Sequence, residues 1–199
     1  MSLIVTGSSS KKFKQVPPGM YLARCYRIIQ LGTQATNFGD KPQVQLLFEV
    51  HGEDNDGLPL VTDRGEPLSV LKTYTLTMNE NGNLSKHLES WRGAAFTAEE
   101  RKEGFDIKKV LGAWAMLNLV ASGEYTNIDN ITQVPSAIRK NGLPEGFNEL
   151  KLLSFKDFDK TFFESLSDKT KEKIKSSPEY KKMMGSSDQG NDFDDDIDF

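Results

Sequence analysis

The chain has 199 residues, of which 37% are hydrophobic and 27% are charged. This balance is typical of a soluble protein with one domain and appended segments, and no apolar run approaches the length that spans a bilayer. The composition therefore excludes a helical membrane protein. The first residues lack the pattern of a secretory signal, so we expect a cytoplasmic protein.

The formal net charge of −4 is distributed unevenly along the chain. Residues 186–199 (SSDQGNDFDDDIDF) carry six Asp and no Lys or Arg, which gives this segment a charge of −6. The first 185 residues hold 25 basic and 23 acidic groups, a net of +2. The overall charge therefore does not exclude a protein whose body binds a polyanion.

Changes in composition divide the chain into four segments. We predict a flexible basic arm over residues 1–15, a domain over 16–135, an extension with helices over 136–184 and a disordered acidic tail over 185–199. The arm carries Lys11, Lys12 and Lys14, and Pro17-Pro18-Gly19 separates it from the domain.

Three segments with strand character open the domain. Residues 20–31 alternate in polarity, and residues 43–50 and 69–78 favour strands by alternation and by Thr content. We expect a loop over 32–42 and a long surface excursion over 51–68. In the first strand, one predicted face holds Tyr21, Ala23, Cys25, Ile29 and Leu31, and the other holds Arg24, Tyr26 and Gln30.

Two helices are predicted after the third strand. Asn83 can cap the first, in which Leu84, Leu88 and Trp91 share one face, and Gly93 ends it. Thr97 and Glu100 can form a capping box for a second, which ends at Gly104.

Two more strands, residues 114–121 and 125–134, complete the domain. Five strands with a helix between the third and fourth is the order of an OB-fold, so we predict a mainly β protein with a five-stranded OB-fold barrel. A β-sandwich is the alternative, but it does not require that helix. In the extension we predict a further strand over 150–155, followed by helices that pack onto the barrel through Phe158, Phe162, Phe163 and Leu166.

Groups that could carry out catalysis are scarce. Cys25 lies in an apolar segment typical of a buried thiol, and we expect His51 and His87 at the surface on separate elements. No phosphate-binding glycine loop occurs, and the Asp-rich tail lacks the pattern of a calcium loop. We therefore expect no enzyme activity, no cofactor and no metal site.

Single-stranded DNA binding needs cations for phosphates and aromatic rings for unpaired bases. Arg24 and Tyr26, like Lys72 and Tyr74, lie two residues apart on a strand and so share a face. We expect Trp114 and Phe48 in the core, whereas Trp91 fits both the core and the interface. The candidate DNA-binding residues are Arg24, Tyr26, Phe38, Lys41, Lys72, Tyr74, Trp91 and Arg92.

The end of the tail mixes acidic and apolar side chains. Such a peptide can place Ile197 and Phe199 in an apolar pocket while its carboxylates meet surrounding cations. We predict that it binds partner proteins, whereas a merely solubilising tail would not need apolar residues at its end. The predicted partner-binding residues are Asp194, Asp195, Asp196, Ile197, Asp198 and Phe199.

These six residues resemble the acidic tip of bacterial single-stranded-DNA-binding proteins, with Asp198 where those proteins usually have proline. The segments GMYLARCYRIIQLGTQ, LESWRGAAFTAEE and GFDIKKVLGAWAMLNLV resemble a group of tailed-phage and prophage single-stranded-DNA-binding proteins with an OB-fold, over roughly residues 16–135. The resemblance implies sequence-independent coating of single-stranded DNA in phage replication or recombination, in the cytoplasm of a bacterial host cell. It also implies that the tail recruits replication or recombination proteins and competes with DNA.

Two rival functions stay open from the residues alone. One is a protein-interaction adaptor of phage recombination or assembly that does not bind DNA, because a body charge of +2 is weak for a nucleic-acid binder. The other is a metal-dependent enzyme acting on DNA.

Overall fold

The computed structural model describes residues 14–187, and its architecture is mainly β. Five strands follow the order β3-β2-β1-β4-β5 through antiparallel pairs, and β6 lies parallel to β1 beside this path. The six-stranded sheet is not closed. The strands are β1 (Gly19–Thr36), β2 (Gly39–His51), β3 (Ser69–Thr75), β4 (Trp114–Ser122), β5 (Tyr125–Thr132) and β6 (Lys151–Leu153).

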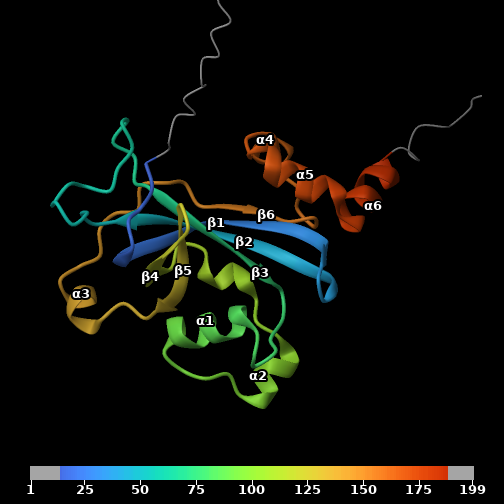
Figure 1. Cartoon of the computed structure of the whole chain (residues 1–199). Helices are drawn as coiled ribbons and strands as arrows, with labels where there is room; N and C mark the ends of the chain where they lie inside the picture. Colours follow the sequence, from blue (N-terminus) through green and yellow to red (C-terminus); the bar gives the residue numbers. More distant parts are fainter. Residues whose placement is uncertain (1–13, 188–199) are drawn as a thin grey trace, which may run out of the picture.

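Helices cover the sheet from two sides. Figure 1 shows α1 and α2 on one side of the sheet and α4, α5 and α6 on the other, close to β6. No helix in the described part of the chain is long and apolar enough to cross a membrane. The helices are α1 (Asn83–Arg92), α2 (Ala98–Glu103), α3 (Ser136–Lys140), α4 (Lys160–Glu164), α5 (Asp168–Ser176) and α6 (Pro178–Ser187), with a 3₁₀ turn η1 (Ile107–Val110).

The predicted order of three strands, a helical insertion and two strands is confirmed. The capping box is also present, because the Thr97 hydroxyl accepts from Glu100 N at 3.1 Å and the Glu100 carboxylate accepts from Thr97 N at 2.8 Å. Asn83 does not cap α1 as predicted: Gly82 occupies the cap position, and Asn83 is the first helical residue. At the other end, Gly93 stops the helix in the left-handed conformation with φ 73°.

The predicted loop over residues 32–42 is wrong. β1 and β2 instead continue as a long hairpin whose tip lies between Thr36 and Gly39. This segment has few large apolar residues, but the ladder extends through it because its backbone groups pair across the hairpin, from Gly32 with Gln43 to Ala35 with Asp40.

Two bulges in β1 change the side of the sheet on which its residues lie. The register shifts between Cys25 and Arg27 and again between Gln30 and Gly32. Ala23 and Cys25 therefore pack in the core under the sheet, whereas Ile29 lies in the cluster on the opposite side. The predicted shared face of Cys25, Ile29 and Leu31 is wrong for this reason.

The sheet consequently has an apolar cluster on each side. The larger one joins the inner sides of β1, β2 and β4 to α1 through residues such as Phe48, Leu117 and Leu88. The smaller one joins β1 and β6 to the C-terminal helices, which confirms that the extension packs on the sheet. It contains Phe162, Phe163 and Leu166, with Phe158 packed against it.

A buried carboxylate holds the start of the extension against the sheet. Glu49 is fully buried, and its oxygens accept from Arg24 Nε at 2.8 Å, His51 Nε2 at 3.2 Å and Phe147 N at 3.0 Å. They also accept from the backbone and side-chain nitrogens of Asn148, both at 2.7 Å. Burial alone would raise the pKa of this carboxyl, but the hydrogen bonds from Asn148, His51 and Phe147 outweigh burial and lower the pKa.

We expect Glu49→Gln to lower the free energy of unfolding by about 3 kcal/mol, because it removes the buried charge that pairs with the partly buried Arg24. The folded-state pKa lies below the ordinary 4.5, so this stabilisation is present above that pH and is lost as pH falls through the folded-state pKa. Urea titrations at neutral and acid pH measure both effects, with exposed Glu66→Gln as the control. Equal stability of the two variants would contradict this role of Glu49.

Candidate nucleic-acid interface

A groove of about 750 Å³ lies between the tip of the β1–β2 hairpin and the segment that joins β3 to α1. Thr36, Phe38 and Lys41 line it from the hairpin, and Thr73 and Thr75 line it from β3. We call it the hairpin groove. Its volume is within the range of ligand-binding clefts in proteins.

The hairpin tip holds Phe38 away from the rest of the protein. The Thr36 hydroxyl donates to Gly39 O at 2.7 Å and accepts from Phe38 N at 3.1 Å, so the turn is fixed by its own hydrogen bonds. Gly39 has φ 84°, which a residue with a side chain adopts only with strain. The Phe38 side chain is 87% exposed, an unusual position for a large apolar ring.

Neutral polar side chains form much of the opposite wall. The Thr77 hydroxyl accepts from Asn79 N at 3.2 Å, and the Asn79 amide oxygen accepts from Asn81 N at 2.9 Å, so consecutive side chains order the segment before α1. Hydroxyl and amide groups can donate hydrogen bonds to phosphate oxygens. They can also donate to or accept from base edges, without preferring one base.

The charge on the hairpin groove is of one sign. Lys41 is exposed and lines the groove, and no Asp or Glu is among the described residues that line it. An exposed ring, a cation and neutral polar groups are the elements that a site for unpaired nucleotides requires.

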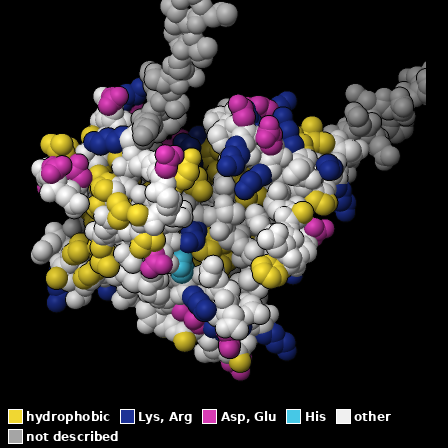
Figure 2. Space-filling model, in the orientation of Figure 1, with side chains coloured by type: hydrophobic (Ala, Val, Ile, Leu, Met, Phe, Trp, Pro, Cys, Tyr) yellow, Lys and Arg dark blue, Asp and Glu magenta, His cyan; other side chains and the backbone are white. Residues whose placement is uncertain are grey.

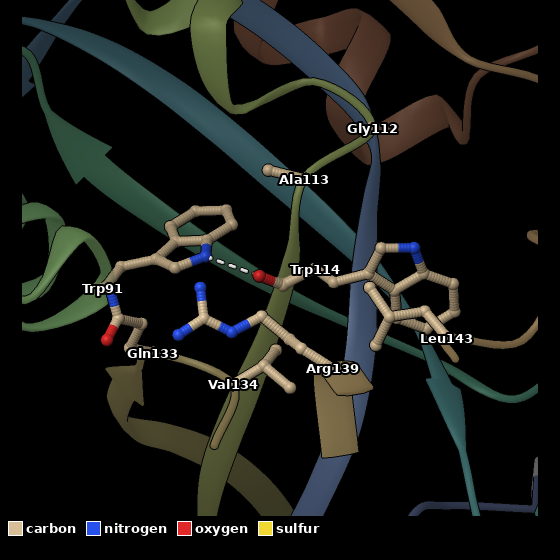
Figure 3. Close-up of a pocket in the computed structure, with 8 residues that line it drawn as sticks. All are labelled: Trp91, Gly112, Ala113, Trp114, Gln133, Val134, Arg139 and Leu143. Carbon is tan, nitrogen blue, oxygen red and sulfur yellow. Dashed lines mark hydrogen bonds between the residues drawn. The ribbon is translucent and has the colours of Figure 1, made fainter. Parts of the chain in front are cut away.

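A second hollow, of about 300 Å³, surrounds the C-terminal end of α1 (Figure 3). Trp91 and Trp114 line it together with Val134, Arg139 and Leu143. The Trp91 indole is buried and its Nε1 donates to Trp114 O at 2.8 Å, which fixes the ring. In Figure 3 the Arg139 guanidinium extends from α3 toward the Trp91 indole. This places Trp91 in the core and also at the edge of a hollow.

The predicted exposure of Tyr26 and Tyr74 is wrong. Tyr74 faces the core, and its hydroxyl lies 2.7 Å from His87 Nδ1. Tyr26 is the residue at the first bulge of β1, and its ring is buried: the Arg27 guanidinium lies 5.1 Å from the ring centre, and the Tyr26 hydroxyl donates to Ser69 Oγ at 3.1 Å. Neither ring can stack on a base in this structure.

Arg24 and Lys72 are engaged within the protein. Arg24 pairs with Glu49 and donates to Asn148 O, and Gly146 packs so closely over its guanidinium that an added Cβ would lie 1.7 Å from Arg24 Cζ. The Lys72 ammonium donates to Ile128 O between β3 and β5, and burial lowers its pKa. The prediction that these two cations face phosphates is therefore not supported by their positions.

Arg92 is exposed, but it is not a free cation. Its guanidinium pairs with Glu100 at 3.1 Å and lies 4.5 Å from the centre of the Phe96 ring. Of the predicted DNA-binding residues, the structure brings Phe38 and Lys41 together at the hairpin groove and places Trp91 and Arg92 at the other end of α1.

The remaining predictions concern Cys25, His87, metal-binding groups and the two terminal segments. Cys25 is buried as predicted, and burial raises the pKa of its thiol to about 12. His87 is buried rather than at the surface, and burial lowers its pKa. Within residues 14–187 no cluster of three or more His, Cys, Asp or Glu could hold a metal ion. Most of the basic arm and the tail tip lie outside the described residues.

Sequence reasoning missed the polar wall of the hairpin groove and two cations that line hollows near the C-terminal end of α1. The repeated Thr and Asn of SVLKTYTLTMNENGN were a signal for the wall, because every second residue of a strand points to the same side and Thr73, Thr75 and Thr77 are spaced by two. Lys109 and Arg139 had no such signal, since they lie on short elements that meet only in the fold.

Comparison of the chain with protein-family models, with curated proteins and with solved structures finds no match.

We expect Tyr74→Phe to lower the free energy of unfolding by about 1–2 kcal/mol, because it leaves His87 Nδ1 buried without its partner. Its affinity for single-stranded DNA should stay within about twofold of the unchanged chain, since the ring does not contact bases. Thermal unfolding and oligonucleotide binding of the same variant separate these effects. A large loss of affinity in a stable variant would restore Tyr74 as a binding residue.

Proposed function

We propose that the chain binds single-stranded DNA without sequence preference and has no catalytic activity of its own. The observation that carries this proposal is the hairpin groove, where an exposed Phe38 and Lys41 stand opposite neutral hydroxyl and amide groups with no carboxylate in the described lining. A base would stack on Phe38, a phosphate would pair with Lys41, and the polar wall would tolerate any base.

The arrangement of the strands supports an OB-type fold. The order β3-β2-β1-β4-β5 places β3 and β5 at the two ends of the sheet, and the Lys72 ammonium links these ends through Ile128 O. A helix between β3 and β4 is also the OB arrangement. OB-folds bind oligonucleotides through the strand 2–3 face and adjoining loops, and the hairpin groove lies at this part of the sheet.

The proposal also includes a role for the acidic tail, which would bind partner proteins. With a charge of −6 and apolar residues at its end, it can occupy the same cationic surface as DNA and compete with it. DNA binding would then release the tail to recruit replication or recombination proteins. In this role the chain would coat DNA in the cytoplasm of a bacterial cell that hosts a phage.

A protein-interaction adaptor is the second candidate. The observation in its favour is the body charge of +2, together with exposed apolar side chains on the extension at Phe147 and Leu150. An adaptor would show no steep fall of affinity for oligonucleotides with salt, whereas a DNA-binding protein must.

We expect Phe38→Ala to weaken binding to oligo-dT by about tenfold, because it removes one base-stacking ring worth about 1–3 kcal/mol. Its free energy of unfolding should not change, since the ring is 87% exposed. Phe147→Ala is the matched control, because Phe147 is 59% exposed on another segment. Fluorescence anisotropy at fixed salt measures both, and equal losses in the two variants would contradict a role for the hairpin groove.

Removal of residues 186–199 should tighten binding to oligo-dT, most at low salt, because screening weakens the competition between the tail and DNA as salt rises. Anisotropy titrations of the full chain and the shortened chain at low and high salt measure the difference. Unchanged affinity at low salt would show that the tail does not compete with DNA.

A further inference from the structure

Four hollows follow one another along α1. The first is the hairpin groove, and the last is the second hollow described above, which is lined by Trp91, Trp114 and Arg139 and which we call the Trp91 hollow. Each one has lining residues in common with the next, so they form a row of neighbouring hollows along α1, of which the middle two lie between α1 and the segment around η1. We call it the α1 crease. From the hairpin end, the shared residues are Thr77 and Leu84, then Leu88 and Phe105, then Trp91 and Ala113.

The α1 crease is lined by cations alone among its charged residues. Lys41 lies at one end, and Arg92, Lys109 and Arg139 lie at the other. Within the described residues, no Asp or Glu lines any of the four hollows. This one-sided lining occurs in a chain with 29 acidic and 25 basic residues, so it is not a consequence of the composition.

Aromatic rings recur along the same path. Phe38 lines the hairpin groove, Phe105 lines the middle of the crease, and Trp91 and Trp114 line its far end. Tyr74 also borders the hairpin groove, but its ring is buried and is not available to a base. The Trp91 hollow is open to solvent beside Arg139, which makes no ion pair within residues 14–187. At about 300 Å³ it can accept a planar ring.

We propose that a strand bound in the hairpin groove continues along the α1 crease and places a base in the Trp91 hollow, with phosphates on Lys109 and Arg139. This inference rests on the proposed function and extends it, because it adds a second contact at the far end of α1. A polyanion with regularly spaced rings fits a path that has cations at both ends, aromatic rings along its length and no Asp or Glu among its described lining residues. The acidic tail carries two Phe, so it would supply fewer rings along this path than a strand of about twelve nucleotides, which supplies one ring or more with each nucleotide.

The two tryptophans make the proposal directly measurable. The chain contains two Trp residues, and both line the Trp91 hollow, so intrinsic tryptophan emission reports its occupancy. Oligo-dT of about four nucleotides can fill the hairpin groove alone, whereas about twelve can reach both ends of the crease. At saturation, the long strand should quench tryptophan emission strongly and the short strand only weakly.

Variants test the same contact by affinity. The double variant Lys109→Gln and Arg139→Gln should bind the long strand about tenfold more weakly, because two phosphate contacts are lost, and should bind the short strand with unchanged affinity. The matched control is Lys108→Gln with Lys140→Gln. These exposed lysines are the sequence neighbours of the tested cations but do not line the crease.

The outcomes separate the inference from the proposed function. If neither strand binds the unchanged chain, the proposed function fails and the inference fails with it. If both strands bind and Lys41→Gln weakens both, but the double variant behaves like its control and the long strand leaves tryptophan emission unchanged, the inference alone is overturned. Quenching by a peptide of residues 190–199, but not by the long strand, would also overturn it by assigning the hollow to the tail.

Discussion

The rest of the structure depends on β1, which pairs with three other strands and contributes to both apolar clusters. Its first half lies between β2 and β4, and beyond the bulge at Cys25 the edge left by β4 is taken by β6. The same bulge directs Ile28 into the core and Ile29 into the opposite cluster. An extra residue in the strand thus provides a buried attachment for the C-terminal helices without interrupting the sheet.

The far end of β1 creates the hairpin groove. Because the β1–β2 ladder runs beyond the core to Thr36 and Gly39, it carries Phe38 out to face the segment before α1. α1 runs from this groove to the Trp91 hollow, and aromatic rings and cations line the hollows at both of its ends. Two carboxylates are engaged within the protein: Glu49 holds the extension, and Glu100 caps α2 and pairs with Arg92. If the chain binds DNA as proposed, the strand would meet cations and aromatic rings at both ends of α1.

The order of strands and helices along the chain, and helix ends such as the Thr97 capping box and the Gly93 stop, could be predicted because they depend on local patterns. The N-cap of α1 could not, because Gly82 takes that position in place of Asn83. The side on which each β1 residue lies could not, because a bulge has no strong sequence signal and shifts every later residue to the other side. Tyr26 shows this directly: a cation two residues away suggested a wet surface, yet the bulge buries the ring beneath Arg27. Phe38 and Lys41 were predicted for the interface from their residue types in an expected loop, and the structure places them together at a groove.

The central claim is that the chain binds single strands of DNA through a cationic, aromatic surface. The most direct test is fluorescence anisotropy of the full chain with labelled oligo-dT and with a matching duplex at two salt concentrations. The account predicts tight binding to the single strand, much weaker binding to the duplex, and a steep loss of affinity as salt rises. Equal binding to both, or an affinity for the single strand that does not change with salt, would contradict it.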